Sequence, residues 1–76
     1  MEMRKKIVMT NNREIYEKLN MLNFSPEVLL KDVNKMQVDR IIKNVNKESL
    51  ILHAEMIGNY ILVKRIGPIN FSIYLR

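Results

Sequence analysis

The chain has 76 residues, a formal net charge of +5 and no cysteine. This length predicts a single domain over residues 1–76 and leaves no room for a second core. Without cysteine, neither a disulfide nor a thiolate-bound zinc can stabilise the fold, and the single histidine, His53, cannot form a metal site alone. We therefore predict no metal, no cofactor and a core held together by apolar packing.

The N-terminal segment does not have the pattern of an export signal. The basic residues Arg4 to Lys6 precede only a short apolar stretch, whereas a signal peptide needs an apolar region of about 7–15 residues. The longest apolar run, Tyr60 to Val63, is far too short to span a membrane. These features predict a cytoplasmic protein without membrane contact. Abundant Asn, Lys and Ile are typical of an AT-rich genome, such as that of a low-GC bacterium, its phage or a mobile element.

The beginning of the chain predicts one strand followed by one helix. Lys5 to Met9 contains two adjacent β-branched residues and precedes turn-forming polar residues, which is typical of a short strand. Asn11 or Asn12 can then cap a helix, because the side-chain oxygen accepts a hydrogen bond from a free amide of the first turn. The helix should end near Asn23. Its apolar stripe is formed by Ile15, Leu19 and Leu22.

A second helix is predicted to begin at Ser25. This residue can serve as the N-cap, and Pro26 stands at the first helical position, where its missing N–H is not needed. Apolar residues continue to about residue 46, but they change from one stripe to another near Asn34–Gln37. The region 25–46 is therefore one continuous helix or two, and we favour one because no Gly or further Pro interrupts it.

The final third of the chain predicts three amphipathic strands in succession. They run from about Ser49 to Ile57, from Tyr60 to Ile66 and from Asn70 to Leu75. Gly58 and Asn59 separate the first two, and both tolerate the positive φ that a tight hairpin turn requires. The pattern predicts an α+β fold with the order β-α-α-β-β-β. Two helices would pack on one face of a small, mostly antiparallel sheet.

The two turns also predict the register of this sheet. Gly58-Asn59 sets Ala54 opposite Val63, and Gly67-Pro68-Ile69 sets Val63 opposite Ile73. Arg65 would lie at one end of the core face and would have to extend its charged group outward. The other residues of the predicted core face are Leu50, Leu52, Ala54, Met56, Ile61, Val63, Phe71, Ile73 and Leu75.

The opposite face of the predicted sheet is the candidate binding site. It combines apolar, aromatic and basic residues, which is the composition of an interface core. An exposed apolar patch of this kind marks a contact with another macromolecule. We predict a small non-enzymatic interaction protein that docks this face on a protein partner or on a second copy of itself. The predicted partner-binding residues are Ile51, Ile57, Tyr60, Leu62, Lys64, Ile66, Tyr74 and Arg76.

A nucleic-acid-binding protein is the alternative. Tyr60 and Tyr74 could stack on bases while basic side chains contact phosphates. The net charge of +5 suits an anionic partner, but acidic residues are interspersed among the basic ones, whereas nucleic-acid binders concentrate positive charge. The residues predicted for this alternative are Arg4, Lys5, Lys6, His53, Lys64 and Arg76.

The predicted order of elements resembles the RelE/ParE family of mRNA-interferase and gyrase-poisoning toxins. The stretch Ile57-Gly58-Asn59-Tyr60-Ile61-Leu62-Val63 is similar to the hairpin of that family, in which Gly, a polar residue and an aromatic precede an apolar strand. The family usually has an arginine after the aromatic, where this chain has Ile61. The resemblance implies a toxin-type ribonuclease as a third hypothesis. We take it as a likeness of architecture and assign no catalytic residue.

Overall fold

The structure, a computed structural model, describes residues 6–68 and 71–76. Its elements are β1 (Lys6–Thr10), α1 (Arg13–Asn20), the 3-10 turn η1 (Met21–Asn23), β2 (Glu27–Lys31), α2 (Lys35–Val45), β3 (Leu52–Ile57), β4 (Tyr60–Arg65) and β5 (Phe71–Leu75). The predicted α+β class is confirmed, with two helices and sheets of two and three strands. Within the described ranges, neither helix has the length and apolar character needed to cross a membrane.

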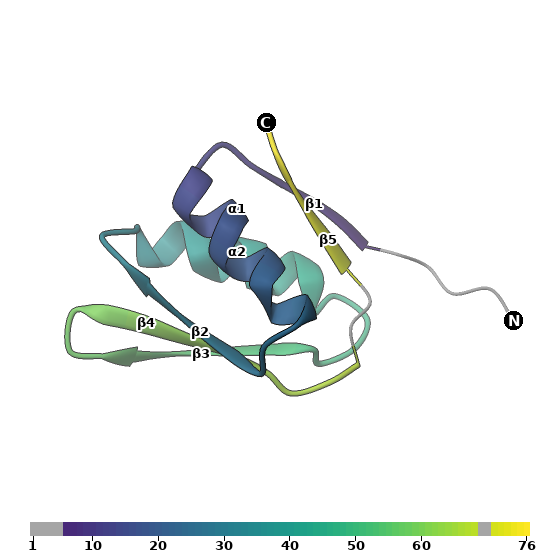
Figure 1. The fold of residues 1–76 in the computed structure, drawn as a ribbon. Coiled ribbons are helices and arrows are strands. Elements are labelled where there is room, and N and C mark those ends of the chain that lie inside the picture. The colour runs from purple at the N-terminus through teal and green to yellow at the C-terminus, as the bar shows by residue number, and fades with distance from the viewer. Residues whose placement is uncertain (1–5, 69–70) are drawn as a thin grey trace, which may run out of the picture.

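The two helices lie between two sheets. Strands β2, β4 and β3 form an antiparallel sheet in that order, and β1 pairs with β5 in a separate parallel ribbon. Figure 1 shows α1 and α2 between the three-stranded sheet and the β1–β5 ribbon. Helix α1 contacts β5 and β2, while α2 contacts β1 and β3. The helices therefore cover one face of the antiparallel sheet, and the ribbon covers the helices from the other side.

Helix α1 follows its sequence signals closely. Asn12 is the N-cap, and its Oδ1 accepts from the backbone N of Ile15 at 3.2 Å. The predicted end near Asn23 is also confirmed, because the last turn tightens into η1. Tight last turns of this kind are common where helix carbonyls lack an intrahelical partner. The apolar stripe Ile15, Leu19 and Leu22 is fully buried.

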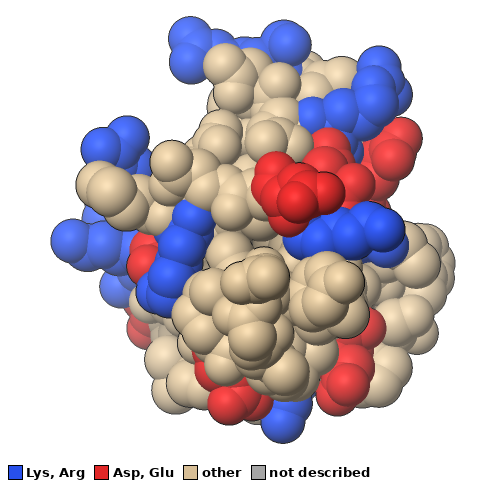
Figure 2. Space-filling view, turned by 90° about the vertical axis from the view of Figure 1, so that its left-hand side faces the viewer, with Lys and Arg blue, Asp and Glu red and all other residues tan. Residues whose placement is uncertain are grey.

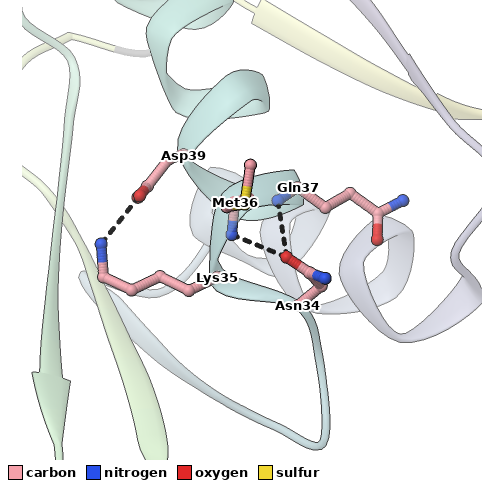
Figure 3. A network of polar contacts seen from close by, with 5 residues as sticks. All are labelled: Asn34, Lys35, Met36, Gln37 and Asp39. Carbon is pink, nitrogen blue, oxygen red and sulfur yellow. Dashed lines mark hydrogen bonds and ion pairs between the residues drawn. The ribbon is translucent and has the colours of Figure 1, made fainter.

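The region predicted as a helix from residue 25 to 46 divides into a strand and a helix. Strand β2 occupies its beginning and pairs with β4, and α2 begins only at Lys35. Asp32 between them has a φ of 59°, which is the left-handed conformation. Asn34 then caps α2, because its Oδ1 accepts from two backbone amides of the first turn, at 2.8 and 3.3 Å (Figure 3). The prediction of one continuous helix from Ser25 is wrong.

Burial explains why β2 is a strand. Val28 and Leu30 are buried, while the three residues around and between them are exposed. This period of two matches a strand with one covered face and does not match a helix. Pro26 suits the start of an edge strand because it has no N–H to pair. Its carbonyl accepts from the backbone N of Arg65 at 2.8 Å and so extends the pairing with β4.

The β3–β4 hairpin has the predicted turn and register. Gly58 has a φ of 61°, and Ala54 lies opposite Val63. Two predicted core residues are nevertheless exposed, Leu50 at 69% and Met56 at 48%. Leu50 precedes β3, which begins later than predicted, and Met56 lies close to the hairpin turn.

Strand β5 does not join the hairpin. The predicted pairing of Val63 with Ile73 is wrong, because Val28 of β2 occupies the position beside Val63. Ile73 instead pairs with Val8 of β1. Strand β4 can have only two neighbours, so the unpredicted strand β2 leaves no place there for β5. Residues 69–70, where we predicted the end of the second loop and the start of the last strand, lie outside the described residues.

Two asparagines at helix ends bond to strand backbones. Asn20 Nδ2 donates to the Ile73 carbonyl at 3.0 Å, and its Oδ1 accepts from the Ile73 N at 3.3 Å. Asn46 Nδ2 donates to the Leu52 carbonyl at 2.7 Å, and its Oδ1 accepts from the backbone N of Ile51 and of Leu52, each at 2.9 Å. Each side-chain amide bonds to the strand backbone in the way that a peptide group of a neighbouring strand would, and so connects one helix end to one sheet.

Arg65 lies at the end of the core face, as predicted, and is half-buried. Its charged group does not simply extend outward, because Nη1 donates to the Leu22 carbonyl at 2.7 Å. That carbonyl lies in η1, at the end of a helical segment where carbonyls need an outside partner. The arginine therefore joins β4 to the end of the first helical segment.

Candidate functional site

The exposed face of the three-stranded sheet is the first candidate site. Successive side chains of a strand point to opposite faces, so the pairing of β2, β4 and β3 places nine residues together on the face away from the helices. Their three rows across the sheet are Glu27–Lys64–His53, Leu29–Leu62–Glu55 and Lys31–Tyr60–Ile57.

Four apolar or aromatic residues occupy the centre and one end of this face, and we call them the sheet patch: Leu29, Ile57, Tyr60 and Leu62. Leu29 and Tyr60 are each 43% exposed and Ile57 is 49% exposed. Figure 2, which faces the turn of the β3–β4 hairpin, shows residues other than Lys, Arg, Asp and Glu over the lower part, with acidic and basic side chains beside them. Exposed apolar residues that share one face of a sheet are typical of an interaction site.

The charges around the sheet patch balance one another. Two lysines and two glutamates share the exposed face, and His53 is neutral in the formal count. Lys64 Nζ lies 3.6 Å from Glu55 Oε1, and both side chains are nearly half exposed, so this pair adds little stability. The whole chain carries +5, so the face is a locally neutral area on a cationic protein.

A hollow of about 320 Å³ adjoins the sheet patch at the β2 edge. Its lining residues are Lys18 of α1 together with Leu29, Lys31 and Tyr60 of the sheet. The hollow has an apolar part and two ammonium groups, and a partner side chain with both apolar and acidic character would fit this combination.

The structure removes three predicted partner-binding residues from this face. Ile51 is fully buried and belongs to the core. Tyr74 lies in β5 and Arg76 directly follows it, so both belong to the β1–β5 ribbon. Ile66, just beyond β4, is half exposed. The predicted residues that share the exposed face are Ile57, Tyr60, Leu62 and Lys64.

Leu29 is a member of the sheet patch that sequence reasoning missed. We predicted a helix at its position because Ser25-Pro26 is a strong helix-start signal. The alternation of Glu27–Lys31 is one of burial in the structure. In the sequence, three adjacent apolar residues stand between two charged ones, so no polar–apolar alternation indicated a strand there.

The residues predicted for nucleic-acid binding are divided among different parts of the molecule. His53 and Lys64 lie opposite each other on β3 and β4, as predicted. Tyr60 and Tyr74, the predicted base-stacking pair, lie in different sheets. The structure therefore does not form the single tyrosine platform on which this alternative was based.

The remaining basic residues of that alternative lie near the chain ends. Arg4 and Lys5 are outside the described residues, and Lys6 begins β1. Arg76 follows β5, where its backbone N donates to the Thr10 carbonyl at 2.7 Å. In the described part of the chain, no cluster of three or more His, Asp or Glu side chains could hold a metal ion.

The chain matches no protein-family model, no curated protein and no solved structure. The resemblance to RelE/ParE toxins therefore remains a prediction from the sequence, and strand β2 between the two helices departs from the order of elements on which it was based.

Proposed function

We propose that the protein is a small interaction module that associates with a second copy of itself through the sheet patch. The main support is the exposure of Leu29, Ile57 and Tyr60 on one face whose register is fixed by strand pairing. Covering apolar surface is favourable by about 25 cal/mol per Å², and a flat sheet face can be covered by another sheet.

Charge favours a second copy at this face. Two molecules that each carry +5 repel one another, and the repulsion is weakest where the meeting surfaces are neutral. In a two-fold symmetric interface, if residue i of one copy contacts residue j of the other, then residue j of the first copy contacts residue i of the second. An axis along the middle row would set Glu27 of each copy against Lys31 of the other. The same axis would set the two Glu55 side chains against each other, each with Lys64 of its own copy at 3.6 Å as a counter-charge.

Sedimentation equilibrium over the micromolar range tests the proposal. We expect a monomer–dimer equilibrium that Leu29→Lys weakens by at least tenfold, because two new charges would be buried at the centre of the interface. Leu50→Lys is the matched control, since Leu50 is exposed and lies outside the sheet. A monomer at every concentration, or an equal loss in the control, would contradict self-association.

A charge exchange tests the two-fold arrangement itself. Glu27→Lys alone should weaken the dimer, because it sets two lysines against each other. The double variant Glu27→Lys/Lys31→Glu should restore the wild-type dimerisation constant, since the pair is re-formed in the opposite sense. If the double variant is weaker than Glu27→Lys, the axis does not lie along the middle row.

A further inference from the structure

A second hollow, of about 250 Å³, lies where the end of the β1–β5 ribbon meets α2. We call it the arginine hollow because two guanidinium groups line it. Its lining comes from three segments that are far apart in the chain: the end of β1 around Thr10, one side of α2 with Gln37 and Arg40, and Arg76 after β5. None of the lining residues belongs to the sheet patch.

Helix geometry and strand pairing bring these segments together. Gln37, Arg40 and Asn44 follow one another at i, i+3 and i+7, so they lie along one side of α2. That helix packs against β1, whose last residue, Thr10, accepts a hydrogen bond from the backbone N of Arg76 at 2.7 Å. This bond continues the parallel pairing beyond β5 and holds Arg76 beside the helix.

The arginine hollow is positively charged. No acidic residue lines it, and none of the ion pairs between described residues includes Arg40 or Arg76. The nearest acid along the helix, Asp39, is paired with Lys35 at 2.7 Å. Figure 3 shows this pair on one side of α2 and Gln37 extending toward the other. Two arginines at one hollow, with no acidic side chain among its described lining residues, attract an anion.

Neutral polar groups accompany the two arginines. Gln37 Nε2 donates to Asn11 Oδ1 at 3.3 Å, which fixes both amides at one wall. Thr10 is only 4% exposed, and its Oγ1 accepts from the backbone N of Asn12 at 3.1 Å, which leaves its O–H as a donor. Amide and hydroxyl groups beside arginines can bind the hydroxyls or ring atoms of an anionic organic ligand.

An adjoining hollow of about 300 Å³ enlarges the space. It is lined by Asn34, Met36, Gln37 and Arg40, so it shares Gln37 and Arg40 with the arginine hollow. Met36 and Met9 supply exposed thioether side chains, one in each hollow. Methionine adapts its shape to flat rings, and sulfur contacts with aromatic rings are favourable.

We propose that the arginine hollow binds a phosphate monoester attached to a ring-sized organic group, as in a nucleoside monophosphate. The planar guanidinium fork matches two phosphate oxygens at once, and two such forks can hold one dianion. The amides and Met36 would contact the organic part. The terminal phosphate of a nucleic-acid strand carries the same chemistry, and the binding experiment distinguishes the two sources.

Isothermal titration calorimetry with the full chain provides the test. We expect AMP to bind, and adenosine to bind at least tenfold more weakly, because it lacks the phosphate. Arg40→Ala and Arg76→Ala should each weaken AMP binding by about tenfold or more, as expected for loss of a charge-assisted bidentate contact. Lys43→Ala is the matched control, because Lys43 is an exposed cation of α2 outside the hollow, and its Kd should stay within about twofold.

Three results would overturn the proposal: no AMP binding at millimolar concentration, equal binding of adenosine and AMP, or an equal loss in Lys43→Ala. Both arginines are exposed, so circular dichroism should show that their variants remain folded. An oligonucleotide with a terminal phosphate identifies the source. Binding much tighter than AMP, and lost when the phosphate is removed, indicates a nucleic-acid end; binding equal to or weaker than AMP indicates a small phosphorylated molecule.

Discussion

The β3–β4 hairpin and the β1–β5 ribbon are both strand pairs, but different interactions hold them. The hairpin strands are joined by a two-residue turn, so their register follows from local geometry. The ribbon strands come from opposite ends of the chain, and only tertiary contacts bring them together (Figure 1). Closing so long a loop has an entropic cost, and the packing of both helices must offset it. The ribbon should therefore be the part that depends most on the core.

The largest loss of stability is expected when the buried aromatic side chain of the β1–β5 ribbon is removed. Phe71 at the start of β5 is only 3% exposed, so Phe71→Ala should lower the free energy of unfolding by about 3–5 kcal/mol. Urea denaturation measures this change. Tyr74→Ala on the same strand is the control. Because Tyr74 is half exposed, this variant should lower the free energy of unfolding by much less. Similar losses in both variants would contradict the view that β5 is held by its buried face.

Replacement of Gly67 by alanine should destabilise the protein more than replacement of Gly58 in the hairpin turn. A Cβ on Gly67 would meet the Leu50 carbonyl oxygen, so Gly67→Ala forces the backbone apart and should destabilise by about 1–3 kcal/mol. Gly58 in the hairpin turn has open space around it and a φ of 61°. The destabilisation by Gly58→Ala should therefore be limited to the cost of a left-handed backbone conformation at a residue other than glycine, about 1 kcal/mol. Thermal unfolding of both variants checks the order, and a greater loss at Gly58 would reverse it.

Removal of the Asn20 amide should loosen the ribbon selectively. Asn20→Ala leaves the backbone N and carbonyl of Ile73 without their partner, with an expected destabilisation of about 1–3 kcal/mol. Hydrogen exchange should become faster at the Ile73 amide and remain unchanged in the β3–β4 hairpin. Uniformly faster exchange in both strand pairs would mean that the two regions open together rather than separately.

The smallest effect is expected on the exposed face of the hairpin. Lys64 Nζ and Glu55 Oε1 are 3.6 Å apart and the side chains are nearly half exposed, so Lys64→Ala should change stability by about 0.5 kcal/mol or less. The measurement should be made at the lowest practicable protein concentration, so that any self-association does not contribute. A loss above about 1 kcal/mol at that dilution would show that solvent does not screen this pair as its exposure implies.

Three local signals are confirmed by the structure, whereas the helix-start signal at Ser25-Pro26 is not. The cap at Asn12, the apolar stripe of α1 and the Gly58-Asn59 turn are each specified within a few residues, and all are present. The candidate site was predicted less completely. Tyr60 and Leu62 share the exposed face, but Leu29 was assigned to a helix and Ile51 proved to be buried.

The arginine hollow could not be foreseen by reading along the chain. Gln37, Arg40 and Asn44 follow helical spacing, yet a polar stripe on a helix normally faces solvent and indicates no ligand. The partner segments, at Thr10 and Arg76, meet that stripe only because β1 pairs with β5 and α2 packs on β1. Their convergence depends on the tertiary fold.

The α+β class, the first helix and the β3–β4 hairpin can be predicted from the chain alone, because caps, turns and apolar periodicity act within short stretches of it. That residues 27–31 form a strand and that β5 pairs with β1 depends on contacts between distant parts of the chain. The segment around Leu30 has signals for both helix and strand, and burial of alternate side chains beside β4 selects the strand. Once β2 pairs with β4, that side of β4 is closed to β5, and β5 pairs with β1 instead.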